Sequence, residues 1–369
     1  MRYYIIAGEA SGDLHGSNLM LALLKNDPNA EFRIFGGDRM AALPNTTLVK
    51  HISEMSFMGF VEVAMNIRTI SRNMKECKSD IESYKPDLVV LIDFPGFNLR
   101  IAEFAKSIGL KTAYYISPKV WAWNTKRVFK IKKFIDKLYT ILPFETEFFQ
   151  KYNYEVEYVG NPLKDAISVY SYDTNFRGNH QLDERPILAI LPGSRKMELD
   201  KILPNMLIAA RNFTNYQIVI AGASNLPEEY YSKFNTKDFK IIFGKTYDIL
   251  ANANIAMVTS GTATLETALF EVPQVVCYRA NALSVKIARM LVDIKFISLV
   301  NLIMDKKVVT ELIQEDCTPE QIIAELSALE NDKPARTTML KEYSILLKKV
   351  GDAGASERAA KSMYQYLLQ

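Results

Sequence analysis

The chain has 369 residues, of which 49% are hydrophobic and 24% are charged. This length corresponds to two large domains or one very large domain, and the composition excludes a mostly disordered chain, a collagen and a small disulfide scaffold. The formal net charge of +3, from 45 basic and 42 acidic residues, is too balanced for a protein whose whole surface binds nucleic acid.

The first 164 residues alternate between short apolar runs rich in β-branched residues and segments of helical period. This alternation is typical of parallel sheets joined by crossover helices. A helix is expected over about 14–24, directly after the first strand. The predicted strands are 3–7, 32–35, 88–92, 112–116, 138–142 and 156–159. We expect residues 1–164 to form an N-terminal Rossmann-like domain.

The pattern weakens over residues 165–185, which we interpret as a linker, and restarts over residues 186–340. The predicted strands of this second half are 187–191, 217–221, 240–243, 255–258 and 274–278. The last part, 341–369, is expected to form helices, and the sequence leaves open whether they pack on the first domain or on a partner chain. The predicted fold class is α/β, with two Rossmann-like, doubly wound domains facing a cleft. Ligands of such sheets bind beyond the carboxyl ends of the strands.

The cysteine and histidine content bears on compartment and metal binding. Cys77, Cys277 and Cys317 are widely spaced, and the chain has only three histidines. This pattern favours a reducing compartment, and we expect neither a metal site nor a cofactor. No apolar run approaches the ~18 residues that span a bilayer, and Glu9 comes too early for a signal peptide. We therefore expect a cytoplasmic protein.

The loop GEASGD, residues 8–13, follows the first predicted strand and opens a helix. Its glycines allow close backbone approach, and a helix N-terminus favours an anion. Glu9, Ser11 and Gly12 of this loop are expected to line the cleft. The loop is not G-x-G-x-x-G, which disfavours a nicotinamide cofactor. A purely structural turn, capped by Ser11 or Asp13, explains the loop equally well.

The segment IDFPGFN places Asp93 at the carboxyl end of the buried strand 88–92. A partly desolvated carboxylate has a pKa above the ordinary value of ~3.9, which improves it as a general base. The structural alternative is a cap for a helix that begins near Phe97. We favour the general base, because the intervening Pro95 and Gly96 make Asp93 an awkward cap.

The segment LPGSR follows the first strand of the second half, with Gly193 and Ser194 in the turn. Arg195 is a planar, permanently charged donor that suits a diphosphate. A capped turn with a surface arginine explains the same residues equally well.

The segment TSGTATLE follows the strand 255–258 and places Ser260, Gly261 and Thr262 at a helix N-terminus. Backbone N–H groups there can bind a phosphate, and Glu266, one turn later, could accept from the hydroxyls of a ribose. The structural alternative is a capping box with Thr262 as the cap. Two such loops in one half favour a nucleotide diphosphate over two coincidental caps.

Two segments have the character of a membrane or lipid contact. The stretch SFMGFVEV carries Phe57, Met58 and Phe60 around a glycine. The stretch KRVFKIKKFIDK is basic and amphipathic, which is typical of a membrane-surface element. Its candidate contacts are Lys126, Arg127 and Lys130. Aromatic residues such as those of the first stretch more often pack in a core. Basic residues such as those of the second more often lie on a solvent-exposed helix face. The stretch SPKVWAW, just after a strand, holds both tryptophans.

Together with SLVNLI, these stretches resemble the signature segments of the lipid-A-disaccharide synthase family. The similarity is collinear from about residue 3 to residue 315, and SPKVWAW followed by KRVFKI is its most specific part. The resemblance implies a B-type glycosyltransferase fold and a metal-independent, inverting transfer. The implied reaction joins UDP-2,3-diacylglucosamine to 2,3-diacylglucosamine 1-phosphate (lipid X), giving the β-1,6-linked lipid A disaccharide 1-phosphate and UDP. It also implies a peripheral protein on the cytoplasmic face of the inner membrane, with no nucleic-acid partner.

The resemblance also implies roles for single residues. Asp93 matches the family's catalytic aspartate and Arg195 its donor-contacting arginine. Asn301 matches the asparagine of a segment that elsewhere reads S-L-P-N-L, although Val300 replaces the proline here. The UDP-binding stretch is matched by Ser260, Gly261, Thr262 and Glu266. Phe57, Met58 and Phe60 are expected to cover the acyl chains.

Other functions remain open at this point. A nucleotide-sugar epimerase of the same fold would need neither an apolar acceptor surface nor a basic face. A non-enzymatic lipid- or nucleotide-binding protein at the membrane is the second alternative, and a dehydrogenase is a distant third. The sequence does not decide between a monomer and a homodimer.

Overall fold

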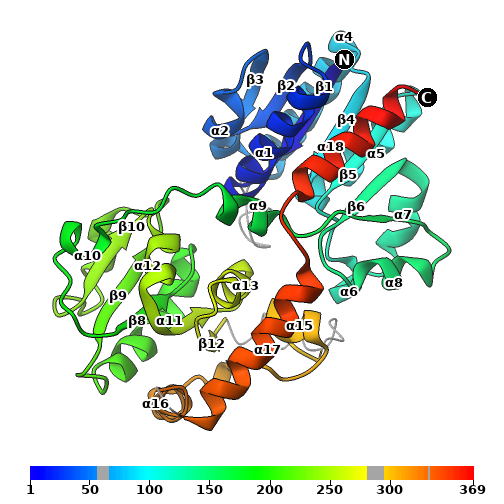
Figure 1. Cartoon of the computed structure of the whole chain (residues 1–369). Helices are drawn as coiled ribbons and strands as arrows, with labels where there is room; N and C mark the ends of the chain where they lie inside the picture. Colours follow the sequence, from blue (N-terminus) through cyan, green and yellow to red (C-terminus); the bar gives the residue numbers. More distant parts are fainter. Residues whose placement is uncertain (56–65, 281–294, 331–332) are drawn as a thin grey trace. The chain divides into compact units, whose positions relative to one another are not determined.

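Each half of the chain is built on one parallel β-sheet covered by helices (Figure 1). The computed structural model describes residues 1–55, 66–280, 295–330 and 333–369. They form two units, of which unit 1 comprises Met1–Ser168 with Gly351–Gln369 and unit 2 comprises Val169–Val350. The predicted α/β class with two Rossmann-like halves is confirmed.

Unit 1 contains a seven-stranded parallel sheet in the order β3-β2-β1-β4-β5-β6-β7. Its strands are β1 (Arg2–Ala7), β2 (Glu31–Gly36), β3 (Thr46–His51), β4 (Leu88–Ile92), β5 (Lys111–Tyr115), β6 (Lys137–Thr140) and β7 (Glu157–Tyr158). Its α-helices are α1 (Ala10–Asn26), α2 (Asp38–Ala41), α4 (Ile67–Tyr84), α5 (Pro95–Ser107), α6 (Val120–Trp123), α7 (Arg127–Phe134), α8 (Glu145–Gln150), α9 (Pro162–Ser168) and α18 (Ala355–Leu367). The edge strand β3 was not expected from the sequence.

The central strands of unit 1 are buried on both faces, which explains their continuous apolar sequence. Side chains of β1 alternate between two cores. Tyr3 and Ile5 pack on one face, where α1 and α18 lie, whereas Tyr4 and Ile6 pack on the other face with α4 and α5. Both cores pack the sheet against its helices, so the loops at its carboxyl edge start from fixed positions.

Unit 2 contains a six-stranded parallel sheet in the order β10-β9-β8-β11-β12-β13. Its strands are β8 (Ile187–Leu191), β9 (Gln217–Gly222), β10 (Lys240–Phe243), β11 (Ala253–Thr259), β12 (Gln274–Tyr278) and β13 (Thr310–Ile313). Its α-helices are α10 (Phe176–Asn179), α11 (Lys196–Ala210), α12 (Thr246–Asn252), α13 (Thr262–Leu269), α15 (Leu299–Met304), α16 (Pro319–Ser327) and α17 (Pro334–Val350).

Both sheets have a switch point, where two neighbouring strands send their crossovers in opposite directions. In unit 1 this point lies between β1 and β4, with Ala7 opposite Ile92. In unit 2 it lies between β8 and β11, with Leu191 opposite Val258. Ligands of doubly wound sheets bind at such points, outside the carboxyl ends of the strands.

The division into units differs from the boundaries expected from the sequence. The expected linker 165–185 begins inside α9, which belongs to unit 1, and its remainder belongs to unit 2. That remainder is fastened through Asp248, which accepts from Tyr170 Oη at 2.6 Å and from Asp173 N at 2.8 Å. These polar contacts explain why a segment without apolar periodicity is nevertheless ordered. Within 341–369, α17 ends in unit 2 and α18 packs against α1 in unit 1.

The start of α18 is held by one carboxylate. Asp165 of α9 accepts hydrogen bonds from the backbone N–H groups of Gly354, Ala355 and Ser356 at 2.6, 3.0 and 2.8 Å. These are amides of the first turn, which have no partner inside the helix. Asp165 therefore fastens the C-terminal helix to the segment where the chain first leaves unit 1.

We predict that Asp165→Ala lowers the stability of unit 1 by about 2–3 kcal/mol, because three amides lose their acceptor. The thermal unfolding transition should move down by several degrees in calorimetry. Asp352→Ala is the matched control, because this exposed aspartate lies in the same turn and its carboxylate caps nothing there. Equal melting temperatures for the two variants would show that the cap does not hold the helix.

Candidate active site

Asp93 lies directly after β4, in a backbone conformation that non-glycine residues seldom adopt. Its φ is 43° and that of Phe94 is 49°, so two consecutive residues are left-handed. The peptide is fixed by its neighbours, since Asp93 N donates to Tyr115 O at 3.3 Å and its carbonyl accepts from Asn98 Nδ2 at 2.8 Å. Tyr114 Oη donates to the same carbonyl. Such strain is retained where surrounding contacts over-determine it, and it clusters at functional sites.

The Asp93 carboxylate does not act as the cap of the following helix. Helix α5 begins at Pro95, two residues before the predicted start near Phe97, and Phe94 is its N-cap residue. Asp93 is half-buried. Burial raises the pKa of Asp93, whereas the Lys119 cation and a hydrogen bond from Phe94 N oppose this effect. A carboxylate with a raised pKa at a switch point suits a general base.

The polar residues of the loop after β1 do not cap α1, contrary to the structural alternative. Glu9 occupies the N-cap position of α1, and Ser11 is exposed in the first turn. The buried Asp13 carboxylate accepts instead from Gly37 N at 2.8 Å and from Met40 N at 3.1 Å. Asp13 therefore ties this loop to the one after β2. Ala10 and Ser11 at the start of α1 stay exposed, whereas Gly12 is buried.

Two glycines of the first loop are required by close packing. A Cβ atom at Gly8 would lie 2.4 Å from Cγ of Phe94, and one at Gly12 would lie 3.1 Å from Cβ of Ala7. Contacts this short force a neighbour to move. Gly8 therefore lets the Phe94 ring lie against the loop, which helps to hold the residue next to Asp93.

Sequence analysis missed Glu145, a fully buried carboxylate in the next part of the same sheet edge. It accepts from Trp121 Nε1 at 3.2 Å and from the backbone N–H groups of Ile141 and Leu142 at 3.1 and 2.9 Å. It thereby fixes the SPKVWAW segment, whose Trp121 packs edge-to-face on Phe144. An acidic residue in the first helical turn after an apolar strand was the available signal.

Burial raises the pKa of Glu145 to about 7. The hydrogen bonds from its two amide donors and from the indole lower the pKa but do not cancel this rise. The Lys119 cation, which acts on Asp93, also lowers the pKa of Glu145. Both carboxylates therefore face one exposed cation at the carboxyl edge of the sheet. Trp121, which donates to Glu145, lies in α6, the short helix that begins directly after Lys119.

In unit 2, the loop after β8 presents an exposed cation. Gly193 has a φ of 96°, and a Cβ atom there would lie 2.5 Å from Oε2 of Glu198. Arg195 is exposed, forms the N-cap residue of α11 and donates to Glu198 Oε1 at 3.2 Å. Ser194 is also exposed, and its carbonyl accepts from Asn225 Nδ2 at 3.1 Å. The guanidinium is thus held at the switch point but open to an anion.

The loop after β11 presents a helix N-terminus without a side-chain cap. Gly261 is the N-cap residue of α13, so the capping box with Thr262 as cap is wrong. Ser260 uses its hydroxyl to donate to Ile297 O at 3.0 Å. Gly261 and Thr262 are exposed. The first-turn amides of α13 are therefore available to an anion, next to the Arg195 loop.

Glu266 lies one turn into α13, beside an aromatic cluster. Its Oε1 accepts from Tyr247 Oη at 3.0 Å, and burial raises the pKa of Glu266. The ring of Tyr247 packs against Tyr170 and Phe270, with centroids 5.1 and 5.5 Å away, and Tyr170 packs against Tyr172. A carboxylate beside aromatic rings suits the hydroxyls of a ribose.

The structure places Asn301, which the sequence predicts as a donor contact, in the interior of unit 2. It is 1% exposed, and its amide is fully used inside unit 2. Nδ2 donates to Val309 O and Glu311 Oε1 at 2.9 and 2.8 Å, and Oδ1 accepts from Val308 N and Val309 N at 2.7 and 3.0 Å. Val300 lies in the first turn of α15, where a proline would also fit, so its presence does not alter the backbone.

The expected lipid and membrane contacts are only partly described. Phe57, Met58 and Phe60 lie outside the described residues. On α7, Lys130 is exposed, as is Lys126 just before it, whereas Arg127 is half-buried. None of the described helices is long and apolar enough to cross a membrane. The described ranges also contain no cluster of three or more His, Cys, Asp or Glu side chains that could hold a metal ion.

Comparison with known proteins gives one consistent relationship. Residues 3–363 match the family described as Lipid-A-disaccharide synthetase. The chain is 40% identical over 365 residues to the lipid-A-disaccharide synthase of Syntrophus aciditrophicus, covering 96% of this chain and 95% of that protein. It is 35% identical to the Myxococcus xanthus enzyme of the same name, covering 99% and 97%.

Solved structures share the fold at low sequence identity. The S. aureus MnaA–UDP structure has a TM-score of 0.71 at 14% identity, covering 100% of this chain and 97% of that chain. The calicheamicin glycosyltransferase CalG4 has a TM-score of 0.62 at 14% identity, covering 100% and 99%. A UDP-GlcNAc 2-epimerase from Neisseria meningitidis has a TM-score of 0.66 at 12% identity, with full coverage of both chains. At these identities the likeness concerns the fold alone.

We predict that Glu145→Gln changes the pH dependence of stability. The folded protein keeps a proton on Glu145 up to about pH 7, whereas the unfolded chain releases it near 4.5. The contribution of this group to stability therefore falls as pH rises from about 4.5 to 7, by on the order of 3 kcal/mol. Gln does not titrate, so the melting temperature of the variant relative to the native protein should rise over this range. A pH-independent difference, or the same trend for the exposed control Glu147→Gln, would refute this.

Proposed function

The chain belongs to the lipid-A-disaccharide synthetase family, and we propose that its reaction is divided between the two units, with the general base in unit 1 and the donor site in unit 2. The protein is a glycosyltransferase that forms the lipid A disaccharide from sugar-nucleotide and lipid substrates. The proposed donor is UDP-2,3-diacylglucosamine and the proposed acceptor is 2,3-diacylglucosamine 1-phosphate (lipid X).

In the proposed mechanism, Asp93 removes the proton from the 6-hydroxyl of the acceptor. The resulting oxygen attacks the anomeric carbon of the donor, and the bond from that carbon to the diphosphate breaks. The product is the β-1,6-linked disaccharide 1-phosphate, and UDP leaves with the electron pair. The fixed, strained peptide of Asp93 orients the carboxylate before the substrate binds, which lowers the cost of reaching the transition state.

The leaving diphosphate is stabilised in this scheme by unit 2. Arg195 and the amides at the start of α13, from Gly261 and Thr262, are donors at adjacent strand ends, and Ser260 shapes their loop. Donors aimed at developing charge commonly supply about 3–4 kcal/mol each when tested by removal. Glu266 is proposed to accept from the ribose hydroxyls, with the aromatic rings beside it facing the nucleoside.

The observation that carries the proposal is the placement of Asp93 at the switch point of the first sheet, outside any helix cap and with a raised pKa. An epimerase of the same fold is disfavoured, because the epimerase neighbours share 15% identity or less, whereas synthases of lipid A disaccharide share 34–40%. We also propose that the protein works peripherally on the cytoplasmic face of the inner membrane, as a monomer or homodimer.

We predict that Asp93→Asn reduces turnover of the two diacylated substrates by about 10²–10⁴-fold, because the variant lacks the base. Its affinity for UDP should stay within about twofold of the native value. In the native enzyme kcat/KM should fall with decreasing pH through a pKa above 3.8, since the base must be ionised. Mass analysis of the lipid product and assay of released UDP provide the measurements.

Three outcomes would contradict the proposed base or the proposed reaction. Near-normal turnover by the Asp93→Asn protein would remove Asp93 from the role of base. Conversion of UDP-N-acetylglucosamine alone, without a lipid acceptor, would identify an epimerase instead. Failure of the native protein to release UDP with both lipids present would favour a non-enzymatic binding protein.

We predict that the exposed basic face of α7 contributes to membrane binding. Lys126, Lys130 and Lys133 are exposed beside Phe129, which is 62% exposed, whereas Lys132 donates to the backbone carbonyl of Asn153. A polybasic surface gains about 1 kcal/mol per lysine near anionic lipid. Reversing the three exposed lysines to glutamate should therefore weaken binding to anionic vesicles at least tenfold at low salt.

The matched control reverses three exposed lysines of unit 2, Lys201, Lys237 and Lys307, which gives the same change in net charge. Vesicle sedimentation across a salt series compares the two triple variants. Equal loss in both would indicate a general charge effect, and no loss in the α7 variant would reject this face as the anchor.

A further inference from the structure

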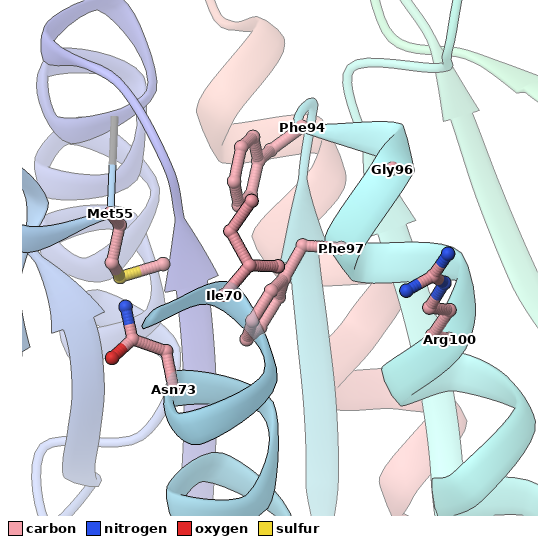
Figure 2. Close-up of a pocket in the computed structure, with 7 residues that line it drawn as sticks. All are labelled: Met55, Ile70, Asn73, Phe94, Gly96, Phe97 and Arg100. Carbon is pink, nitrogen blue, oxygen red and sulfur yellow. The ribbon is translucent and has the colours of Figure 1, made fainter. Parts of the chain in front are cut away.

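A cavity of about 250 Å³ lies in unit 1 beside the Asp93 loop (Figure 2). Among the described residues it is lined by Met55, by α4 and by the turn from β4 into α5. Its lining residues are Met55, Ile70, Asn73, Phe94, Gly96, Phe97 and Arg100. Figure 2 shows the side chains of Met55, Ile70, Phe94 and Phe97 gathered in the space between α4 and the end of β4.

The lining of the cavity suits an apolar chain rather than a sugar or a base. Met55, Ile70, Phe94 and Phe97 supply hydrocarbon and aromatic surface. Asn73 is the buried polar exception: its Nδ2 donates to Glu54 O at 3.0 Å, and its Oδ1 has no partner among the described residues. A volume of 250 Å³ lies below the ~300–1,000 Å³ of sites that enclose a whole small molecule, so it fits part of a ligand.

The cavity shares a wall with the candidate active site. Phe94 lines the cavity, directly follows Asp93 and packs against Gly8 on the first loop. An apolar ligand chain that contacts Phe94 therefore lies beside the residue that directly follows Asp93. At the rim, Gly96 and the exposed Arg100 are four residues apart on α5, which places them on the same helix face.

We propose that this cavity binds one acyl chain of the acceptor, and that Arg100 at its rim pairs with the anionic phosphate of the same molecule. The inference rests on the proposed function, in which unit 1 receives a diacylated sugar phosphate. The acceptor is favoured over the donor, because the cavity adjoins the proposed base and because the donor's charged groups are assigned to unit 2. Burying the chain here would hold the acceptor hydroxyl near Asp93, driven by the removal of apolar surface from water.

Gly96 allows a clean test, because a Cβ atom there would meet no other atom within 4 Å. Gly96→Leu should fill part of the cavity without displacing the fold, and Gly96→Ala is the matched control. Initial rates are measured at saturating donor with acceptors that carry tetradecanoyl or hexanoyl chains. We expect Gly96→Leu to raise the KM for the long-chain acceptor at least about tenfold, with little change for the short-chain acceptor and none for Gly96→Ala.

Arg100→Gln tests the rim independently, and this exposed side chain can be replaced without affecting the core. It should raise the acceptor KM for both chain lengths at least about fivefold, and Arg100→Lys should restore most of the affinity. UDP affinity, measured by calorimetry, should be native in every variant and reports that each one is folded.

Three results would overturn the proposal. These are an unchanged acceptor KM in Gly96→Leu, an equal loss with both chain lengths, or an effect on the donor KM instead of the acceptor KM. Failure of the proposed function is a separate result, because the native enzyme would then form no disaccharide from any acceptor.

Discussion

The structure depends on the reversal of winding between two neighbouring strands in each parallel sheet. Between β1 and β4, and again between β8 and β11, the crossovers leave in opposite directions, so the loops after these strands are not covered by a shared helix. In each sheet, the two loops that follow these strands begin next to paired residues, Ala7 with Ile92 in unit 1 and Leu191 with Val258 in unit 2. This arrangement brings Gly8–Asp13 beside Asp93 in unit 1, and Gly193–Arg195 beside Ser260–Thr262 in unit 2.

The two switch points differ in what their loops offer. In unit 1 the loop after β4 is strained, and the buried Asn98 and Tyr114 side chains bind its backbone and leave the Asp93 carboxylate for chemistry. In unit 2 the loops offer a guanidinium and uncapped helix amides, with Glu266 and aromatic rings one turn away. The proposed base and the proposed anion site thus lie on separate units, and a sugar transfer from a nucleotide requires both.

Secondary structure could be predicted best where it depends on the burial of one short, continuous segment. Leu88–Ile92 and Ile187–Leu191 were predicted with their observed bounds, because a strand buried on both faces must be continuously apolar. The strand Thr46–His51 was missed, since an edge strand with polar, partly exposed residues lacks that signal.

The roles of polar side chains depended on tertiary partners that spacing does not reveal. Asp13 binds amides of a loop 24 residues away in sequence, and Asn301 is fully occupied by the 308–311 segment. The importance of Glu145 is visible only once Trp121 and the 141–142 amides surround it. The motif residues could therefore be named from the sequence, but their hydrogen-bond partners could not.

The most direct measurement of this account is a crystal structure of the protein with UDP. The account predicts the diphosphate at the carboxyl edge of the second sheet, with its oxygens within hydrogen-bonding distance of Arg195 and of the Gly261 and Thr262 amides. A diphosphate bound instead at Gly8–Asp13, beside Asp93, would contradict the division of roles between the two units.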